Sequence, residues 1–342
     1  MGARRPVAYG RPRLANGPVT VGRLLSLADP EAWRRALGPL RHGPAHTHWY
    51  NAALAESVDG EIALFEYGDG DDRAVCPIVL RRHRQSMDIA TPYGFSGFAT
   101  RGDCGELPDA FRRFATDREW VCGYITLHPL FPHPFRDSDG LEQGRTVYVL
   151  DLAGGEARWL ASMHETHRYE IRKDAKLLSS IVSDVDPIAR ALPQLYAQTL
   201  ARVGASDVYR FSAATLNAWL SSPDCLTFGL GDPLQAVILC LYTPHVADYF
   251  INASTEEGRR YTRVLLWAAL LELERRGVPY FNLGGGAREG DALHAFKQRF
   301  GGRAMSVPVL KQIYRREEFA RLCPPRNPAE HATVYFPPYR SP

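Results

Sequence analysis

The chain has 342 residues, which is enough for about two domains at roughly 150 residues each. Hydrophobic residues make up 45% and charged residues 23%, which is typical of a globular protein and excludes a disordered or fibrous chain. No run of about 18 uncharged apolar residues occurs, so the sequence predicts no transmembrane helix. No apolar segment follows the basic N-terminus, so we expect no secretory signal and a cytoplasmic location.

The cysteines support the same location. They are scattered, without the paired spacing of a zinc site or a disulfide framework, at positions 76, 104, 122, 225, 240 and 323. Free thiols of this kind are typical of a reducing compartment. We expect no metal site and no tightly bound cofactor.

Positive charge is concentrated near the start of the chain, although the net charge is only +3. Residues 1–42 contain eight arginines against Asp29 and Glu31. A basic arm of this kind can contact a phosphate backbone. A solvated tail is the alternative.

The first half of the sequence alternates strand patterns with turns. Residues 61–67 and 74–80 flank an acidic Gly-Asp turn and predict a hairpin. Further strands are expected at residues 88–93, 121–127 and 146–151, and a helix at 107–116. Residues 127–139 are rich in proline and histidine and have no periodicity.

The second half shows the same mixture. Helical spacing occurs at residues 159–178, 186–203, 212–220 and 259–276, and strand patterns at 226–230, 234–242, 247–253 and 280–283. Gly277 stands where a helix-terminating glycine is expected. A glycine run, Gly284 to Gly286, precedes a last helix that extends to Phe300. We expect an α/β (α+β) fold with a first domain at 1–145, a second at 146–320 and a proline-rich tail at 321–342.

Three segments of the chain form a characteristic series. They are an aromatic-glycine loop at residues 91–97 (TPYGFSG), a basic helix at 167–175 (HRYEIRKDA), and a strand-glycine segment at 280–286 (YFNLGGG) followed by FKQRFGG at 296–302. In this order they resemble the FemAB-like branch of the GNAT acyltransferase superfamily. Asn282 stands where the family often has Asp. Residues 254–263 lack the glycine-rich pyrophosphate loop of ordinary acetyltransferases.

The resemblance implies two tandem GNAT-like domains packed into one body. Family members transfer an acyl or aminoacyl group from a thioester or a tRNA ester to an amine. No heptad pattern is sustained, so we expect the compact form that lacks a coiled-coil arm. The resemblance also places the acyl group where two central strands splay apart, between residues 247–253 and 280–283.

Lys297 is the main catalytic candidate. It is one of four lysines among 41 basic residues, so the chain's preference for arginine does not explain it. With Phe296 it matches the family's F-K motif, in which the lysine is implicated in contacting the donor or the developing negative charge. The alternative is a solvent-facing lysine on an amphipathic helix.

Several other residues are candidates for binding the donor or the substrate. Arg168, Arg172 and Lys176 follow His164 at intervals of four, so a continuous helix would present them on one face to an anionic ligand. Neighbouring acidic residues would neutralise that face instead. Gly284 and Gly285 would let backbone approach a ligand closely, and Asn282 precedes them.

Aromatic and histidine side chains add weaker candidates. Tyr93 and Phe95 would wall a substrate pocket, although aromatic residues beside glycine are often part of the core. His128 and His133 could remove a proton from an amine.

The first hypothesis for function is an aminoacyltransferase that uses aminoacyl-tRNA as co-substrate and forms an amide with an amine-bearing acceptor, either a peptidoglycan precursor or a natural-product intermediate. The missing pyrophosphate loop and the basic segments favour tRNA over CoA as donor. The alternatives are an acyl-CoA-dependent N-acyltransferase and a non-catalytic nucleic-acid- or nucleotide-binding module on a degenerate GNAT fold. Loss of Lys297 from the gap, or a filled gap, would favour the last.

Overall fold

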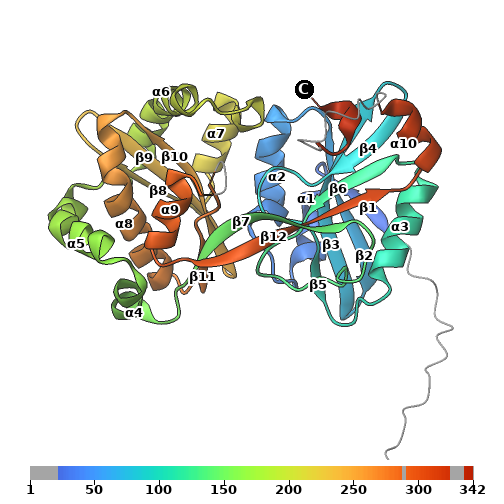
Figure 1. Ribbon diagram of the computed structural model, residues 1–342, viewed down its shortest axis with the longest axis horizontal. Helices are drawn as coiled ribbons and strands as arrows, with labels where there is room; N and C mark the ends of the chain where they lie inside the picture. The colour runs from blue at the N-terminus through green and yellow to red at the C-terminus, as the bar shows by residue number, and fades with distance from the viewer. Residues whose placement is uncertain (1–21, 287–289, 324–334, 342) are drawn as a thin grey trace, which may run out of the picture.

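A computed structural model describes residues 22–286, 290–323 and 335–341. Figure 1 shows two lobes joined by a pair of long strands, β7 (Leu141–Asp151) and β12 (Arg303–Ile313). The predicted basic arm lies outside the described residues up to position 21. None of the described helices is long and apolar enough to cross a membrane.

The N-terminal lobe contains the strands and helices that precede β7. The predicted hairpin is confirmed, with Tyr67 of one strand opposite Ala74 of the other. In chain order the elements are β1 (Arg23–Ser26), α1 (Pro30–Leu37), α2 (His48–Leu54), β2 (Glu61–Asp69), β3 (Asp72–His83), β4 (Ser86–Ala90), β5 (Ala99–Arg101), α3 (Leu107–Asp117) and β6 (Cys122–Thr126).

The C-terminal lobe follows β7, and its four predicted strands are all present. Its elements are α4 (Gly155–Ser162), α5 (Glu165–Asp174), α6 (Val185–Val203), α7 (Ala213–Leu220), β8 (Cys225–Leu230), β9 (Ala236–Thr243), β10 (Val246–Ser254), α8 (Thr262–Arg275), β11 (Tyr280–Asn282) and α9 (Ala292–Arg299). After β12 the chain returns to the N-terminal lobe through α10 (Arg316–Leu322).

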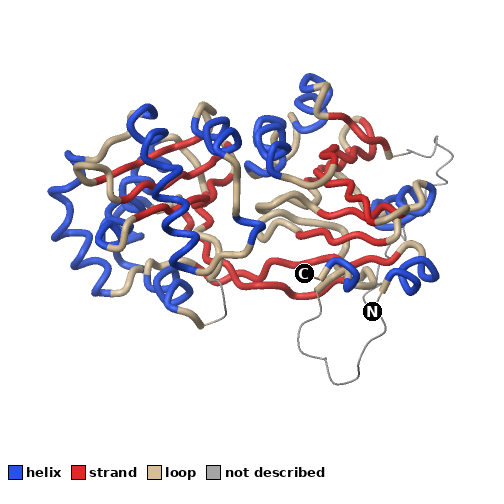
Figure 2. Tube along the Cα trace, turned by 90° about the horizontal axis from the view of Figure 1, so that it is seen from above, coloured by secondary structure: helices blue, strands red, loops and turns tan. Residues whose placement is uncertain are grey.

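One sheet runs through both lobes in the order β1-β2-β3-β4-β6-β12-β7-β11-β10-β9-β8, with β5 beside β3. The chain crosses between the lobes twice, first through β7 and then back through β12. Strand β12 pairs with β6 on one side and with β7 on the other. Figure 2 shows two long strands passing from one lobe into the other. The predicted boundary near residue 145 therefore falls inside β7.

The predicted helix at residues 159–178 is wrong as a single element. Met163 has an extended backbone with ψ of 150°, which ends α4. His164 then caps the next helix, and its side chain accepts a hydrogen bond from the backbone N–H of Thr166. A 3-10 turn, Ala175–Ser180, follows α5. The four-residue spacing of basic side chains thus runs over a cap, a helix and a turn.

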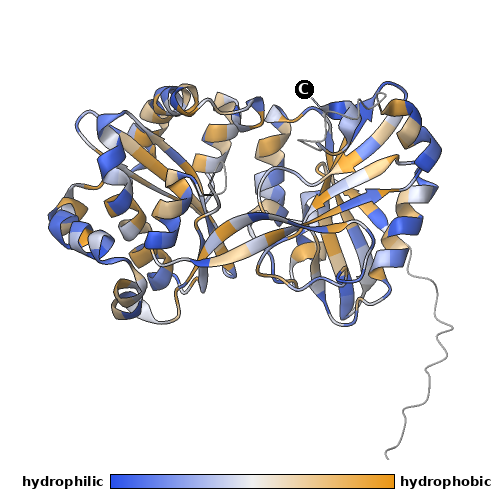
Figure 3. Cartoon of the chain, in the orientation of Figure 1, coloured by the Kyte–Doolittle hydropathy of each residue, from blue (hydrophilic) through white to orange (hydrophobic). Residues whose placement is uncertain are grey.

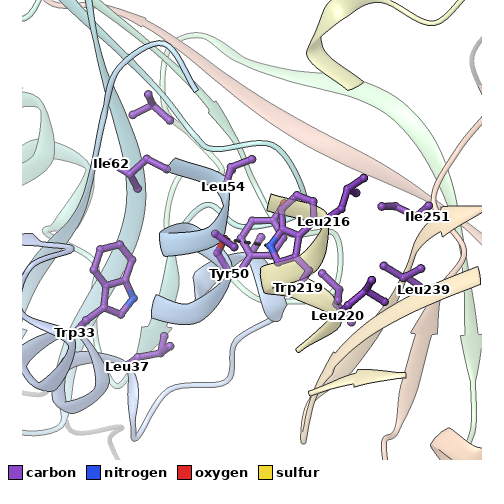
Figure 4. Close-up of a cluster of buried hydrophobic side chains, with 14 of the residues drawn as sticks. Trp33, Leu37, Tyr50, Leu54, Ile62, Leu216, Trp219, Leu220, Leu239 and Ile251 are labelled. Carbon is purple, nitrogen blue, oxygen red and sulfur yellow. Dashed lines mark hydrogen bonds between the residues drawn. The ribbon is translucent and has the colours of Figure 1, made fainter. Parts of the chain in front are cut away.

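An apolar cluster holds the lobes together (Figure 4). The members labelled in Figure 4 come from α1, α2 and β2 of one lobe and from α7, β9 and β10 of the other: Trp33, Leu37, Tyr50, Leu54, Ile62, Leu216, Trp219, Leu220, Leu239 and Ile251. We call it the interlobe cluster. The Trp219 indole N–H donates to the Tyr50 carbonyl oxygen at 3.3 Å, and the two rings stack at 5.4 Å.

A second cluster lies on the opposite face of the C-terminal sheet, beneath α8. Figure 3 shows hydrophobic residues concentrated on the strands of this lobe, whereas α5 is largely hydrophilic. The two faces of β10 therefore contact different cores. The candidate site lies beside this strand.

Candidate active site

Strands β10 and β11 separate soon after they meet. They run parallel and pair only at Ala247 with Phe281 and at Asp248 with Asn282. Beyond this point the β11 segment stays with β7, where the Leu283 N–H donates to the Tyr148 carbonyl oxygen at 2.8 Å. The rest of β10 has no partner on that side among the described residues. The splay lies where the resemblance placed it.

A bulge in β10 lies beside the opening. The register with β9 shifts between Tyr249 and Ile251, so Phe250 is the extra residue. Phe250 and Ile251 both pack with the interlobe cluster, whereas Tyr249 packs beneath α8. The opening is therefore bordered by side chains from both faces of the sheet.

A cavity of about 510 Å³ occupies the opening. It is lined by eight aromatic residues, Tyr50, Tyr93, Phe95, Tyr196, Tyr209, Phe211, Tyr249 and Phe250. Among the described residues that line it, the charged ones are Arg145, Asp248 and Lys297, and the glycine run Gly284–Gly286 forms part of its wall. The gap is thus open and retains the lysine, in contrast to what a degenerate fold would show.

Lys297 reaches the cavity from α9. Its side chain is buried, with 6% of the residue exposed, and its Nζ donates to the Gly285 carbonyl oxygen at 2.7 Å. Burial, reinforced by the positive charge of Arg145, lowers the pKa of Lys297 to about 7. The solvent-facing alternative is therefore wrong for this side chain.

The glycine run is shaped by packing against β7 and Lys297. A Cβ on Gly285 would come within 2.4 Å of the Thr146 carbonyl oxygen, and one on Gly284 within 3.3 Å of the lysine Nζ. Gly284 also has φ of +70°, in the left-handed region that favours glycine. The absence of side chains here lets a backbone carbonyl orient the ammonium.

Asn282 lies behind the cavity rather than in its lining. Its side-chain Nδ2 donates to Asp248 Oδ1 at 3.0 Å, and its Oδ1 accepts from the Gly284 N–H at 2.9 Å. The side chain thus links β10 to the glycine run. Asn282 therefore holds Asp248 and Gly284 in place from behind the cavity.

Tyr93 and Phe95 both line the cavity. The Tyr93 carbonyl oxygen accepts from the Tyr50 hydroxyl at 2.6 Å, which fixes the loop to α2. The Arg145 guanidinium lies 5.3 Å from the Phe95 ring centre, within the range of a cation–π contact. The aromatic-glycine loop therefore forms the N-terminal lobe's part of the wall.

The structure does not bring Phe296 to the cavity lining. Its ring packs 5.1 Å from His167 and 5.9 Å from Phe300, on the cluster beneath α8. His128 also lies outside this cavity, with its ring stacked on Phe131 at 3.9 Å. His128 and His133 both line a separate surface pocket.

The three basic candidates on α5 and the following turn also lie outside the cavity lining. The Arg168 guanidinium donates to the carbonyl oxygens of Leu160 and Met163, so it caps the end of α4. Arg172 and Lys176 are exposed. Any contact they make with a ligand would be outside this cavity.

Sequence reasoning missed Asp248. It is the only acidic residue among the described residues that line the cavity, and it is 4% exposed. Burial raises the pKa of its carboxyl to about 7, and the hydrogen bond from Asn282 partly opposes that shift. A single carboxylate inside the apolar strand pattern at residues 247–253 was the available signal.

Comparison with models of known protein families and with curated proteins finds no match. Solved structures do match. FemX aligns over 88% of this chain and 99% of its own, with a TM-score of 0.64 and 11% identity. L-PGS from Bacillus licheniformis aligns over 84% and 92%, with a TM-score of 0.56 and 12% identity. The C-terminal domain of a putative lysylphosphatidylglycerol synthetase from Agrobacterium fabrum also aligns over 84% of this chain and 92% of its own, with a TM-score of 0.54 and 17% identity. The chain therefore shares the fold of FemX and of L-PGS.

Proposed function

We propose that this protein is an acyltransferase that transfers an aminoacyl group from aminoacyl-tRNA to an amine and forms an amide bond. The observation that carries the proposal is the splay of β10 from β11 with Lys297 buried beside it. An ester carbonyl placed in this gap meets an ammonium whose position is fixed by the Gly285 carbonyl oxygen. The fold that the chain shares with FemX and L-PGS is consistent with this activity.

The chemistry needs few protein groups. A neutral amine attacks the ester carbonyl, the C–N bond forms, and negative charge develops on the carbonyl oxygen. The Lys297 ammonium stabilises that charge, and a single well-placed donor is worth about 3–4 kcal/mol. The C–O bond then breaks, and the tRNA hydroxyl leaves with a proton from the attacking nitrogen. Holding donor and acceptor in one cavity supplies the remaining acceleration.

The end of β10 favours tRNA over CoA as donor. Ordinary acetyltransferases cradle the CoA pyrophosphate with glycine-rich backbone after this strand, as the resemblance implies. Here the single glycine of that segment, Gly258, packs so closely that a Cβ would lie 2.0 Å from the Gln235 carbonyl oxygen. The backbone N–H groups that could donate to a phosphate are already bonded, that of Ser254 to Thr199 Oγ1 and that of Thr255 to the Gln235 carbonyl oxygen, each at 2.9 Å. This segment offers no comparable cradle.

The donor is tested directly with a total pool of charged tRNA and a panel of amine acceptors. We expect amide product that RNase abolishes and that removal of CoA leaves unchanged. The acceptor panel includes peptidoglycan-precursor amines and small amines of natural-product type. Product that requires acyl-CoA and survives RNase would contradict the tRNA donor and establish the acyl-CoA-dependent alternative.

A further inference from the structure

Asp248 is a buried carboxylate in the cavity, and no cationic side chain of residues 22–286, 290–323 or 335–341 is paired with it. The hydrogen bond from Asn282 Nδ2 is the only one that the described residues make to its side chain. No lysine or arginine of the described residues forms an ion pair with it, although Arg145 and Lys297 line the same cavity. Buried carboxylates are usually paired. A ligand that carries a positive charge would supply the missing partner.

The walls around this carboxylate suit the same ligand. The Phe250 ring lies 5.7 Å from the Tyr50 ring and 5.9 Å from the Tyr93 ring, in edge-to-face geometry. Burial is the main cause that raises the pKa of both tyrosines, and the nearby Asp248 charge adds to it. Aromatic faces attract alkylammonium groups and pack against apolar bodies. The cavity thus combines an unpaired anion with aromatic surfaces.

The position of Asp248 on the strand separates it from the lysine. Its neighbours Ala247 and Tyr249 pack beneath α8, so Asp248 faces the opposite side, toward α6 and α7. Lys297 enters from α9, which packs on the α8 side through Phe296. The two groups therefore approach the gap from opposite faces of the sheet.

We propose that Asp248 and its aromatic walls form the acceptor subsite, which binds a primary alkylammonium joined to an aromatic or aliphatic body and removes one proton from its nitrogen. The inference rests on the proposed function and names the acceptor class. One ammonium proton passes to the Asp248 carboxylate and frees the lone pair that attacks the ester. A second proton leaves the nitrogen with the tRNA hydroxyl, so the products are an amide, a free tRNA end and a protonated Asp248.

The protonation states in the cavity permit this step near neutral pH. The Asp248 carboxyl has a pKa of about 7. The titratable groups close enough to feel its charge are Tyr50, Tyr93 and, on the α8 side of the sheet, Cys240. Burial is the main cause that raises the pKa of each, so all three stay neutral. Lys297 titrates in the same range. A variant that removes only the carboxylate therefore separates the two groups.

Calorimetry with phenethylamine tests the subsite without any donor. Its aliphatic amine has a pKa of about 10, like lysine, so it is an ammonium throughout the range used. Ionisation of a group with a pKa near 7 changes about tenfold between pH 6 and pH 8, so wild-type protein should bind phenethylammonium about tenfold more tightly at pH 8. Neutral 3-phenylpropanol should bind more weakly and without this dependence.

Asp248→Asn should lose both the preference for the ammonium and its pH dependence, and circular dichroism should show an intact fold. Asp151→Asn, which alters an exposed carboxylate at the end of β7, is the matched control and should behave as wild type. Equal binding of the two probes by wild type, or an unchanged preference in Asp248→Asn, would overturn the subsite.

A turnover assay with charged tRNA tests the proton transfer. Hydroxylamine is neutral at pH 7 and needs no base, whereas phenethylamine does. Asp248→Asn should slow transfer to phenethylamine on the order of 100-fold and change transfer to hydroxylamine only a few-fold. Equal slowing with both acceptors would overturn the role as proton acceptor. If wild type uses neither acceptor, the proposed function fails, and calorimetry still decides the subsite.

Discussion

Replacing Lys297 with methionine should stabilise the folded protein at pH 6 while it removes the charge that we propose to be catalytic. The side chain is 6% exposed, and burial lowers its pKa from 10.5 to about 7. At about 1.4 kcal/mol per pKa unit, the buried ammonium costs about 5 kcal/mol below pH 7. Methionine has a similar length and no charge. It loses the hydrogen bond to the Gly285 carbonyl oxygen, worth about 2 kcal/mol.

The net gain in the free energy of unfolding is therefore about 3 kcal/mol at pH 6, or about 4 °C in Tm for a chain of this length. The gain should shrink with pH. Between the folded pKa near 7 and the unfolded value of 10.5, the unfolded state binds more protons, so wild-type stability rises with pH. At pH 9 the remaining cost is about 2 kcal/mol, and the variant and wild type should be nearly equal.

Urea unfolding at pH 6 and pH 9 measures both differences. Lys173→Met is the matched control, because Lys173 is exposed on α5 and its replacement should change stability by less than about 0.5 kcal/mol at either pH. A Lys297→Met variant that is less stable than wild type at pH 6, or a difference that does not change with pH, would refute the burial argument.

Three further predictions follow from the same contacts. Lys297→Ala should lower kcat/KM on the order of 100-fold, and Lys297→Arg should recover little, because the planar guanidinium places its charge elsewhere; activity close to wild type in the alanine variant would remove the lysine from the mechanism. Arg168→Ala should lower Tm because the carbonyl oxygens at the end of α4 lose the guanidinium that caps them, whereas Arg172→Ala should leave Tm unchanged. If the variant with both substitutions shows a flatter salt dependence of donor binding than wild type, α5 contacts an anion. Trp219→Ala should cost about 3–5 kcal/mol of unfolding free energy because it empties the centre of the interlobe cluster; a loss below about 1 kcal/mol by urea unfolding would mean that the cluster does not hold the lobes together.

The sequence predicted those strands and helices whose apolar pattern and flanking turns lie within one short stretch of the chain. The hairpin at β2 and β3 and the strands β8 to β10 have apolar runs with turns between them, and each is present. Strand β12 was not predicted, because its sequence contains Pro308 and polar residues, and its pairing with both β6 and β7 depends on distant parts of the chain. The break at Met163 was missed because helical spacing continues through it.

In the candidate site, too, local motifs indicated single residues but not their surroundings. Lys297 was proposed from its motif, but its lowered pKa comes first from burial and then from the charge of Arg145 on β7, and its hydrogen bond goes to the backbone of the glycine run. The sequence does not place these groups beside it. Arg168 was interpreted as a ligand-binding residue, although it caps the preceding helix. Asp248 was missed because a strand pattern does not show that one buried carboxylate lines a cavity without an ion pair to any described lysine or arginine.

Hydroxamate formation from charged tRNA and hydroxylamine most directly tests whether the splayed strands carry out acyl transfer. Wild-type protein should form product faster than a blank without protein, RNase should abolish it, and Lys297→Ala should reduce the protein-dependent rate on the order of 100-fold. Equal rates for wild type and Lys297→Ala, or no rate above the blank, would contradict the assignment of this gap as the catalytic centre.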